Sequence, residues 1–293
     1  MRVASLLPSA TEIVYALGLE DHLVAVTFEC DEPERARLDH RVVVSGADTS
    51  AMTPAEIDAH VRTERAAGRD LYTLDEGAFA ELVPDVVLTQ DLCRVCALPT
   101  GQVDAALDHL GCTADVVTLD PSRLEHVLGD IERVATALGA PARAQPLVAS
   151  LRERLAAVEH AVAGRRRPRT CVVEWIDPLF CGGHWIPDQV RAAGGEPVGM
   201  HHGTASGPTS WDVLRAAEPE VVVVAPCGFG LDGASEQARV VAAELPDARV
   251  WAIDGDAVVV RPGPRLVDGV EALASILHPG VLPASPLTRS LRS

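Results

Sequence analysis

Five cysteines of this chain each follow a short apolar run that is predicted to be a strand, and they are the residues best suited to chemistry. They are Cys30, Cys93, Cys96, Cys181 and Cys227. Ligands of open α/β sheets collect at the carboxyl ends of strands, so these thiols are candidate ligands for zinc or an iron–sulfur cluster. Cys93 and Cys96 form a C-x-x-C pair, a spacing at which two thiolates can share one metal and which redox pairs also use. Free reactive thiols and plain packing stay open as alternatives.

Glycine-rich loops of the C-terminal half carry a second group of candidates. His184, in Gly182-Gly183-His184-Trp185, is a candidate ligand for a metal or for the cobalt of a corrinoid, with plain solvation as the alternative. Aromatic residues are only 3% of the chain, yet several of them lie in these loops. Two interpretations stay open for them: they line an apolar ligand pocket, or they anchor the hydrophobic core. They are Trp175, Trp185, Trp211 and Phe229. Arg261 begins a proline-rich loop and either binds a carboxylate or phosphate or lies in an exposed turn.

Short apolar runs alternate with amphipathic helical patterns along the chain, and these elements must position the candidates. Capping boxes predict helix starts at Ser9-Ala10-Thr11-Glu12, at Thr53-Pro54-Ala55-Glu56 and at Ser122-Arg123-Leu124-Glu125. The apolar runs include Val86 to Thr89, Val221 to Ala225 and Ala257 to Val260, each predicted to be a buried strand. This alternation predicts an α/β protein with mainly parallel sheets covered on both faces.

An internal correspondence indicates two similar lobes. Leu82 to Gln90 and Ala217 to Ala225 each contain a proline, an acid and a buried strand, with a cysteine just beyond. Between them, residues 142–163 follow the pattern of a single long helix. We therefore expect two Rossmann-like lobes at 1–140 and 168–280, one linker helix at 141–167, and a frayed tail at 281–293.

The composition excludes several classes of protein. The net charge is -17, from 42 acidic and 25 basic residues, so neither a nucleic acid nor an anionic membrane surface is an expected partner. The chain has no lysine, which excludes a Walker-type phosphate loop, and no apolar run long enough to span a bilayer. It begins without an apolar leader, which predicts a cytoplasmic protein. Motifs of hydrolases and dehydrogenases are missing, which favours a binding protein over an enzyme.

The chain resembles the cobalamin- and iron-chelate-binding proteins of ABC importers, in particular a leaderless branch described as cobalamin-binding. The resemblance rests on residues 2–12, on the strands opened by Pro84-Asp85 and Pro219-Glu220, and on the long helix. It implies two Rossmann-like lobes with a rigid helical hinge and a shallow cleft that holds a corrinoid or metal chelate. It also implies that Pro8 and Ser9, with the loops of Trp185 and Arg261, face that cleft.

Three hypotheses follow. The first is a cytoplasmic two-lobed binding protein that holds cobalamin, a related corrinoid or a metal chelate in the interlobe cleft. The second is a metalloprotein or redox enzyme that holds zinc or an iron–sulfur cluster through the five cysteines in the same cleft. The third is the substrate-binding protein of an ABC importer, with a permease as partner and a leader that is absent from this numbering.

Overall fold

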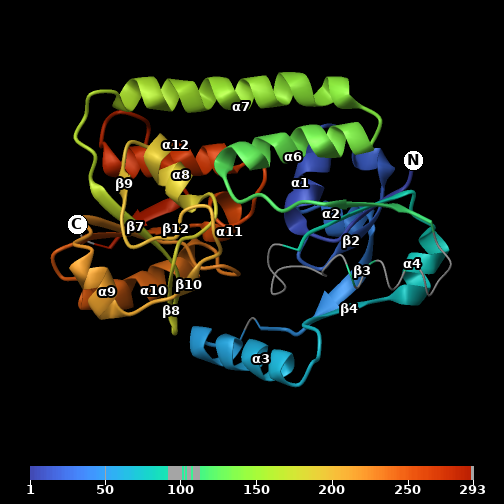
Figure 1. Cartoon of the computed structure of the whole chain (residues 1–293), viewed down its shortest axis with the longest axis horizontal. Coiled ribbons are helices and arrows are strands. Elements are labelled where there is room, and N and C mark those ends of the chain that lie inside the picture. The colour runs from blue at the N-terminus through green and yellow to red at the C-terminus, as the bar shows by residue number, and fades with distance from the viewer. Residues whose placement is uncertain (50, 92–100, 102, 104–106, 108–112, 292–293) are drawn as a thin grey trace. The chain divides into compact units, whose positions relative to one another are not determined.

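The structure is a computed structural model, and it describes residues 1–49, 51–91, 101, 103, 107 and 113–291 (Figure 1). The chain divides into two compact units. Unit 1 comprises Met1–Asp120 and Leu128–Val148, and unit 2 comprises Pro121–Val127 and Ala149–Ser293. Helix α7 (Pro141–Val162) lies where the sequence predicts the long helix, and its residues belong partly to each unit.

The sheet of unit 1 has the strand order β4-β3-β2-β1-β5-β6. Its strands are β1 (Val3–Ser5), β2 (Leu23–Thr27), β3 (Arg41–Gly46), β4 (Tyr72–Leu74), β5 (Val86–Thr89) and β6 (Asp115–Thr118). Neighbouring strands are parallel except for β3 with β4. Because β1 lies between β2 and β5, the strand order reverses there, and that reversal is where open α/β sheets bind ligands.

Helices connect these strands. They are α1 (Pro8–Ala16), α2 (Ala36–Asp39), α3 (Pro54–Ala66) and α4 (Glu76–Leu82), with the 3-10 turn η1 (Glu20–His22), while α6 (Leu124–Ala137) follows β6 and leads to α7. The capping box predicted at Thr53 and Glu56 is present. The box predicted at Ser9 is not, because Pro8 is the first helical residue and Leu7, which has no polar side chain, is the N-cap. Phe79 of α4 is fully buried in a core formed with the strands.

The sheet of unit 2 has the order β10-β8-β7-β11-β12-β13, and β9 pairs with β7 outside that path. Its strands are β7 (Arg169–Ile176), β8 (Leu179–Cys181), β9 (Glu196–Pro197), β10 (Gly207–Pro208), β11 (Val221–Val224), β12 (Arg249–Ile253) and β13 (Thr288–Ser290). The central strands β7, β11 and β12 are parallel, whereas β8, β10 and β13 run antiparallel to their neighbours. The expected parallel sheet therefore forms the middle of unit 2 and has antiparallel margins.

Helices cover both faces of this sheet. They are α8 (Ile186–Ala192), α9 (Trp211–Ala216), α10 (Leu231–Glu244), α11 (Gly255–Val258) and α12 (Leu266–Leu277). Figure 1 shows α8 and α12 on one side of the strands and α9 and α10 on the other. Side chains of α10 share a buried cluster with alternate residues of the strands. Unit 2 is therefore a doubly wound α/β layer.

Two segments of unit 2 differ from the expectation. The run Ala257 to Val260, predicted as a strand, forms instead the end of the short helix α11 and the turn after it, because the Asp254 side chain accepts a hydrogen bond from Ala257 N at 3.1 Å and caps the helix. The expected frayed tail contains β13, which pairs with β12. Arg289 of β13 forms an ion pair with Asp232 of α10 at 2.9 Å, which fixes the tail on unit 2.

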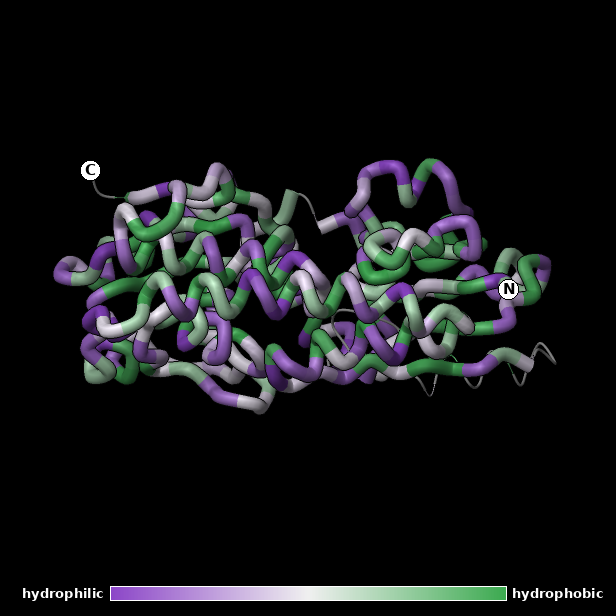
Figure 2. The backbone as a smooth tube through the Cα atoms, turned by 90° about the horizontal axis from the view of Figure 1, so that it is seen from above, coloured by the Kyte–Doolittle hydropathy of each residue, from purple (hydrophilic) through white to green (hydrophobic). Residues whose placement is uncertain are grey.

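Polar contacts of two arginines hold α7 in place, one in each unit. Within unit 1, Arg143 donates to the backbone oxygens of Leu17 at 3.2 Å and Gly18 at 2.8 Å. Within unit 2, Arg154 donates to Glu271 at 2.7 Å and 2.9 Å and also to Asp268. Hydrophilic residues recur along this helix in the hydropathy view from above (Figure 2). α7 therefore has one polar face in water. Buried residues at helical spacing and the contacts of two arginines attach it to the rest of each unit.

Candidate ligand-binding site

Two aromatic side chains meet at the carboxyl ends of the central strands of unit 2. Trp175 is the penultimate residue of β7, and Phe229 follows β11. Their ring centroids are 5.7 Å apart, and both side chains are partly exposed. The indole Nε1 of Trp175 donates to the backbone oxygen of Asp177 at 3.0 Å, which orients the ring. This pair lies at the strand-order reversal of unit 2, where β9 is added on one side of β7 and β11 on the other.

Trp185 is buried, unlike Trp175. Its side chain is only 4% exposed, and its Nε1 donates to the backbone oxygen of Val259 at 2.8 Å. The ring of His184 stacks on it at a centroid distance of 5.5 Å. Trp185 is therefore a buried support for His184, and it offers little surface of its own to a ligand.

His184 has an unusual backbone. Its φ is +49°, in the left-handed region that non-glycine residues rarely occupy. Two hydrogen bonds to the neighbouring loop fix it: His184 N donates to Thr204 O at 2.6 Å, and Gly203 N donates to His184 O at 3.1 Å. The two loops approach so closely because Gly183 has no Cβ. Burial lowers the pKa of the His184 imidazole, so the ring is neutral at neutral pH.

The other predicted ligand-binding residues of unit 2 are partly buried. Arg261 lies in the loop between α11 and α12. Trp211 is the first residue of α9, whose N-cap Ser210 accepts a hydrogen bond from Val213 N at 3.3 Å, and its ring packs on the core of unit 2. Of the predicted aromatic residues, the structure therefore brings Trp175 and Phe229 together and places Trp211 against the core.

In unit 1 the turn at Pro8 and Ser9 follows β1 directly. Pro8 is partly exposed, whereas Ser9 is 3% exposed and lies in the first turn of α1. Proline suits the first helical position because it has no N–H to leave unpaired. The turn lies beside the strand-order reversal between β1 and β5.

The cysteines fall into different environments. Cys30 is fully buried, and its Sγ lies 3.0 Å from Thr11 Oγ1 and 3.3 Å from Thr27 Oγ1. Cys181 is fully buried on β8, and its hydrogen bond to Cys171, together with burial, holds the pKa of the Cys171 thiol well above its usual range. Neutral thiols are poor metal ligands, because the thiolate is the form that binds.

Cys227 is exposed in the loop after β11, and Cys93 and Cys96 lie outside the described residues. In the described ranges, no three His, Cys, Asp or Glu side chains gather as they would around a metal ion. Cys30, Cys181 and Cys227 are therefore not brought into a common ligand group there, and zinc or an iron–sulfur cluster has no support.

Sequence reasoning missed two groups of residues. Phe28 follows β2, its ring centroid is 6.0 Å from that of Tyr72, and the Tyr72 hydroxyl donates to Glu29 Oε1 at 3.2 Å. The position of Phe28 directly after a predicted strand was a usable signal. Nothing in the sequence, however, points to Tyr72 as its partner.

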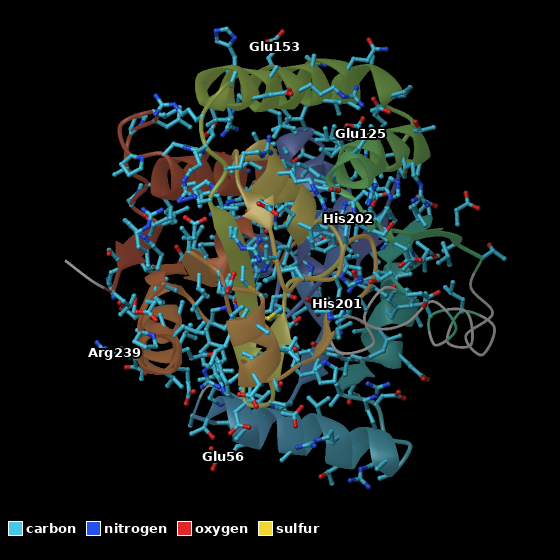
Figure 3. All side chains as sticks on the ribbon, turned by 60° about the vertical axis from the view of Figure 1, so that its left-hand side comes forward. Glu56, Glu125, Glu153, His201, His202 and Arg239 are labelled. Atoms are coloured by element: carbon cyan, nitrogen blue, oxygen red, sulfur yellow. The ribbon has the colours of Figure 1, made fainter. Side chains whose placement is uncertain are left out.

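The second missed group anchors the start of α6 on unit 2. Arg123 Nη1 lies 2.8 Å from Nδ1 of His202, and Nε2 of His202 lies 2.6 Å from Asp188 Oδ1. Asp188 also accepts a hydrogen bond from Leu124 N at 3.3 Å. His202 and its sequence neighbour His201, both labelled in Figure 3, lie on the loop between β9 and β10. Adjacent loop histidines gave no sign of this contact, because its partners lie far away in sequence.

Comparisons with known proteins agree with this fold. A vitamin B12-binding protein of Yersinia pestis (strain Pestoides F) is 26% identical over 238 residues, which are 80% of this chain and 72% of the relative. A periplasmic heme-binding protein from Pseudomonas aeruginosa superposes with a TM-score of 0.72 at 23% identity, over 99% of this chain and 97% of that one. The periplasmic vitamin B12-binding protein of Vibrio cholerae gives a TM-score of 0.67 at 23% identity, over 94% and 96%. The two structural likenesses show the fold.

The expectation of a cytoplasmic protein is wrong, because the matching family and these structural relatives are periplasmic. None of the helices in the described ranges has both the length and the apolar composition that a membrane span requires. The family model named periplasmic binding protein matches residues 3–252, and this chain therefore belongs to the periplasmic binding protein family.

Proposed function

We propose that this chain is the substrate-binding component of an ABC importer, that its substrate is a corrinoid such as cobalamin, and that it delivers this substrate to a permease. The observation that carries the proposal is the partly exposed Trp175–Phe229 pair at the strand-order reversal of unit 2. Aromatic rings at such a position suit the apolar faces of a flat macrocycle. The vitamin B12-binding relatives, which align over 80% of the chain, support the same class of ligand.

The charge of the chain favours a corrinoid over heme. Heme carries two propionates that are ionised at neutral pH, whereas the side groups of cobalamin are mostly neutral amides. A chain with a net charge of -17 repels a dianion and leaves a neutral ligand unaffected. Arg261, which is partly buried in the loop before α12, is a cationic residue of unit 2 that suits an amide or phosphate oxygen of the ligand.

Calorimetric titration of the full chain with cyanocobalamin and, separately, with hemin tests this proposal. We expect saturable one-to-one binding of cyanocobalamin, weakened about tenfold in each of Trp175→Ala and Phe229→Ala, because aromatic anchors contribute most of the energy of such contacts. Val240→Ala trims a side chain of α10 that is 45% exposed and is the matched control, with unchanged affinity.

Two results would contradict the proposal. Absence of cyanocobalamin binding would refute the corrinoid as substrate. Tighter binding of hemin than of cyanocobalamin would contradict the argument from net charge. The proposed substrate would then be heme and not a corrinoid.

A further inference from the structure

His184 combines a rigid backbone with a ring that makes no hydrogen bond to any described residue. Neither ring nitrogen is among the fully buried polar atoms that lack a partner in the described ranges. The ring is nevertheless partly buried, and it stacks on Trp185 at 5.5 Å. A nitrogen lone pair is thus held at a defined place and remains available.

The backbone of His184 indicates that this placement is functional. A φ of +49° costs energy for any residue with a Cβ, and glycine would adopt it without that cost. Residues held in such conformations cluster at ligand-binding sites, where the surrounding structure maintains the strain. Here the Thr204 and Gly203 hydrogen bonds maintain it, on a loop whose neighbouring positions are already glycines, Gly182 and Gly183.

The support beneath the ring is equally defined. The indole of Trp185 is fixed by its hydrogen bond to Val259 O at 2.8 Å, so the stacked imidazole cannot tilt freely. Burial lowers the pKa of His184 and keeps the imidazole neutral at neutral pH, which is the form that ligates metals. In the described ranges, no second and third metal-ligating side chains accompany it, so it is not part of a resident metal site.

We infer that His184 is an axial ligand to the metal at the centre of the bound macrocycle, an inference that rests on the proposed corrinoid-binding function. A corrin ring already supplies four equatorial nitrogens to cobalt, so one protein nitrogen is enough. With aquocobalamin, the bond from cobalt to water breaks, water leaves, and a His184 ring nitrogen donates its lone pair to form a cobalt–nitrogen bond. The oxidation state of cobalt does not change, and no proton is transferred.

The test compares aquocobalamin, whose exchangeable site holds water, with cyanocobalamin, whose corresponding site is blocked by cyanide. His184→Gly is the chosen variant because glycine tolerates the +49° backbone. We expect wild-type protein to shift the visible spectrum of aquocobalamin to that of its imidazole complex and His184→Gly to abolish the shift. Added imidazole should restore it. His201→Ala, which removes an exposed histidine of the same unit, is the control and should keep the shift.

Affinities provide the second readout. Removing even the outer partners of metal ligands weakens metal binding about 10–100-fold, so His184→Gly should weaken aquocobalamin binding at least about tenfold. Cyanocobalamin binding should weaken less than aquocobalamin binding, because cyanide already blocks its cobalt, and the urea midpoint of unit 2 should not fall. Wild-type protein that binds aquocobalamin without a spectral shift would overturn the axial ligand and leave the proposed function intact. Failure to bind either corrinoid would overturn the proposed function itself, and the axial ligand with it.

Discussion

Gly183→Ala should destabilise unit 2 by wedging apart the two loops that hold His184. A Cβ at Gly183 would lie 2.2 Å from Ser206 N and 2.7 Å from Thr204 O. Both are backbone atoms, so no flexible side chain can move out of the way. Restoring ordinary contact near 3.5 Å requires the loops to separate by about 1.3 Å.

That separation sets the magnitude. The hydrogen bond from His184 N to Thr204 O, now 2.6 Å, would lengthen to about 3.9 Å, beyond the range of a hydrogen bond. Overpacking costs about 1–3 kcal/mol, and a lost backbone hydrogen bond about 1 kcal/mol. The free energy of unfolding of unit 2 should therefore fall by about 3 kcal/mol.

Tryptophan fluorescence during urea unfolding measures this change, because all four tryptophans of the chain lie in unit 2. The variant should show a lower midpoint with an unchanged slope. Gly129→Ala in α6 is the control: nothing lies within 4 Å of its Cβ position, so it should leave the tryptophan transition unchanged and stabilise unit 1 by about 0.5–1 kcal/mol. A midpoint for Gly183→Ala equal to that of the wild type would refute the steric reasoning.

Three further predictions concern an ion pair of α7, the thiols and acid stability. Arg154→Leu leaves Asp268 and Glu271 without their shared cation and should destabilise unit 2 by about 1 kcal/mol at low salt, less at high salt, because the network is partly exposed; an effect independent of salt in urea unfolding would contradict this. Among the described cysteines, Cys227 alone should react with iodoacetamide in the native state, and peptide mapping that finds the buried three equally labelled would refute their burial. Burial lowers the pKa of His40 below 6.5, so the unfolded chain binds a proton at this residue more readily than the folded chain does, and the free energy of unfolding should decline as pH falls through 6.5. His40→Gln should flatten this part of the curve of stability against pH. An unchanged curve would show that another group is responsible.

Much of the fold could be predicted, because burial on both faces leaves a clear mark in the sequence. Val221–Val224 is buried along its whole length, as a central parallel strand should be. The long helix was equally visible, since its apolar residues recur at helical spacing over many turns. Ala257 to Val260 carries the same β-branched signal and yet forms the end of α11 and the turn after it. There the Asp254 cap and the close approach of Gly255 to the backbone of Ala225 outweigh local propensity.

The candidate site was only partly accessible to the same reasoning. A position after a strand tells where the backbone lies but not where the side chain points. Phe229 and Cys227 share one loop with exposed positions, whereas Cys30 turns inward and contacts the hydroxyls of Thr11 and Thr27. Those contacts join residues up to 19 positions apart, so no local sequence pattern predicts them.

The buried thiols and the strained backbone of His184 bear on the kind of metal that the proposed cargo contains. A free metal ion needs three or four protein donors, and in the part of the chain that the structure describes Cys30 and Cys181 are buried and are not gathered with such donors. A metal already held by a macrocycle needs one donor and a surface that contacts the ring. The proposed site takes both from unit 2, with His184 as the donor and the Trp175–Phe229 pair as the surface, each fixed by hydrogen bonds or ring contacts within that unit. The proposal of a metal-centred cargo therefore rests on this one donor and this one aromatic surface, and the aquocobalamin titration tests it.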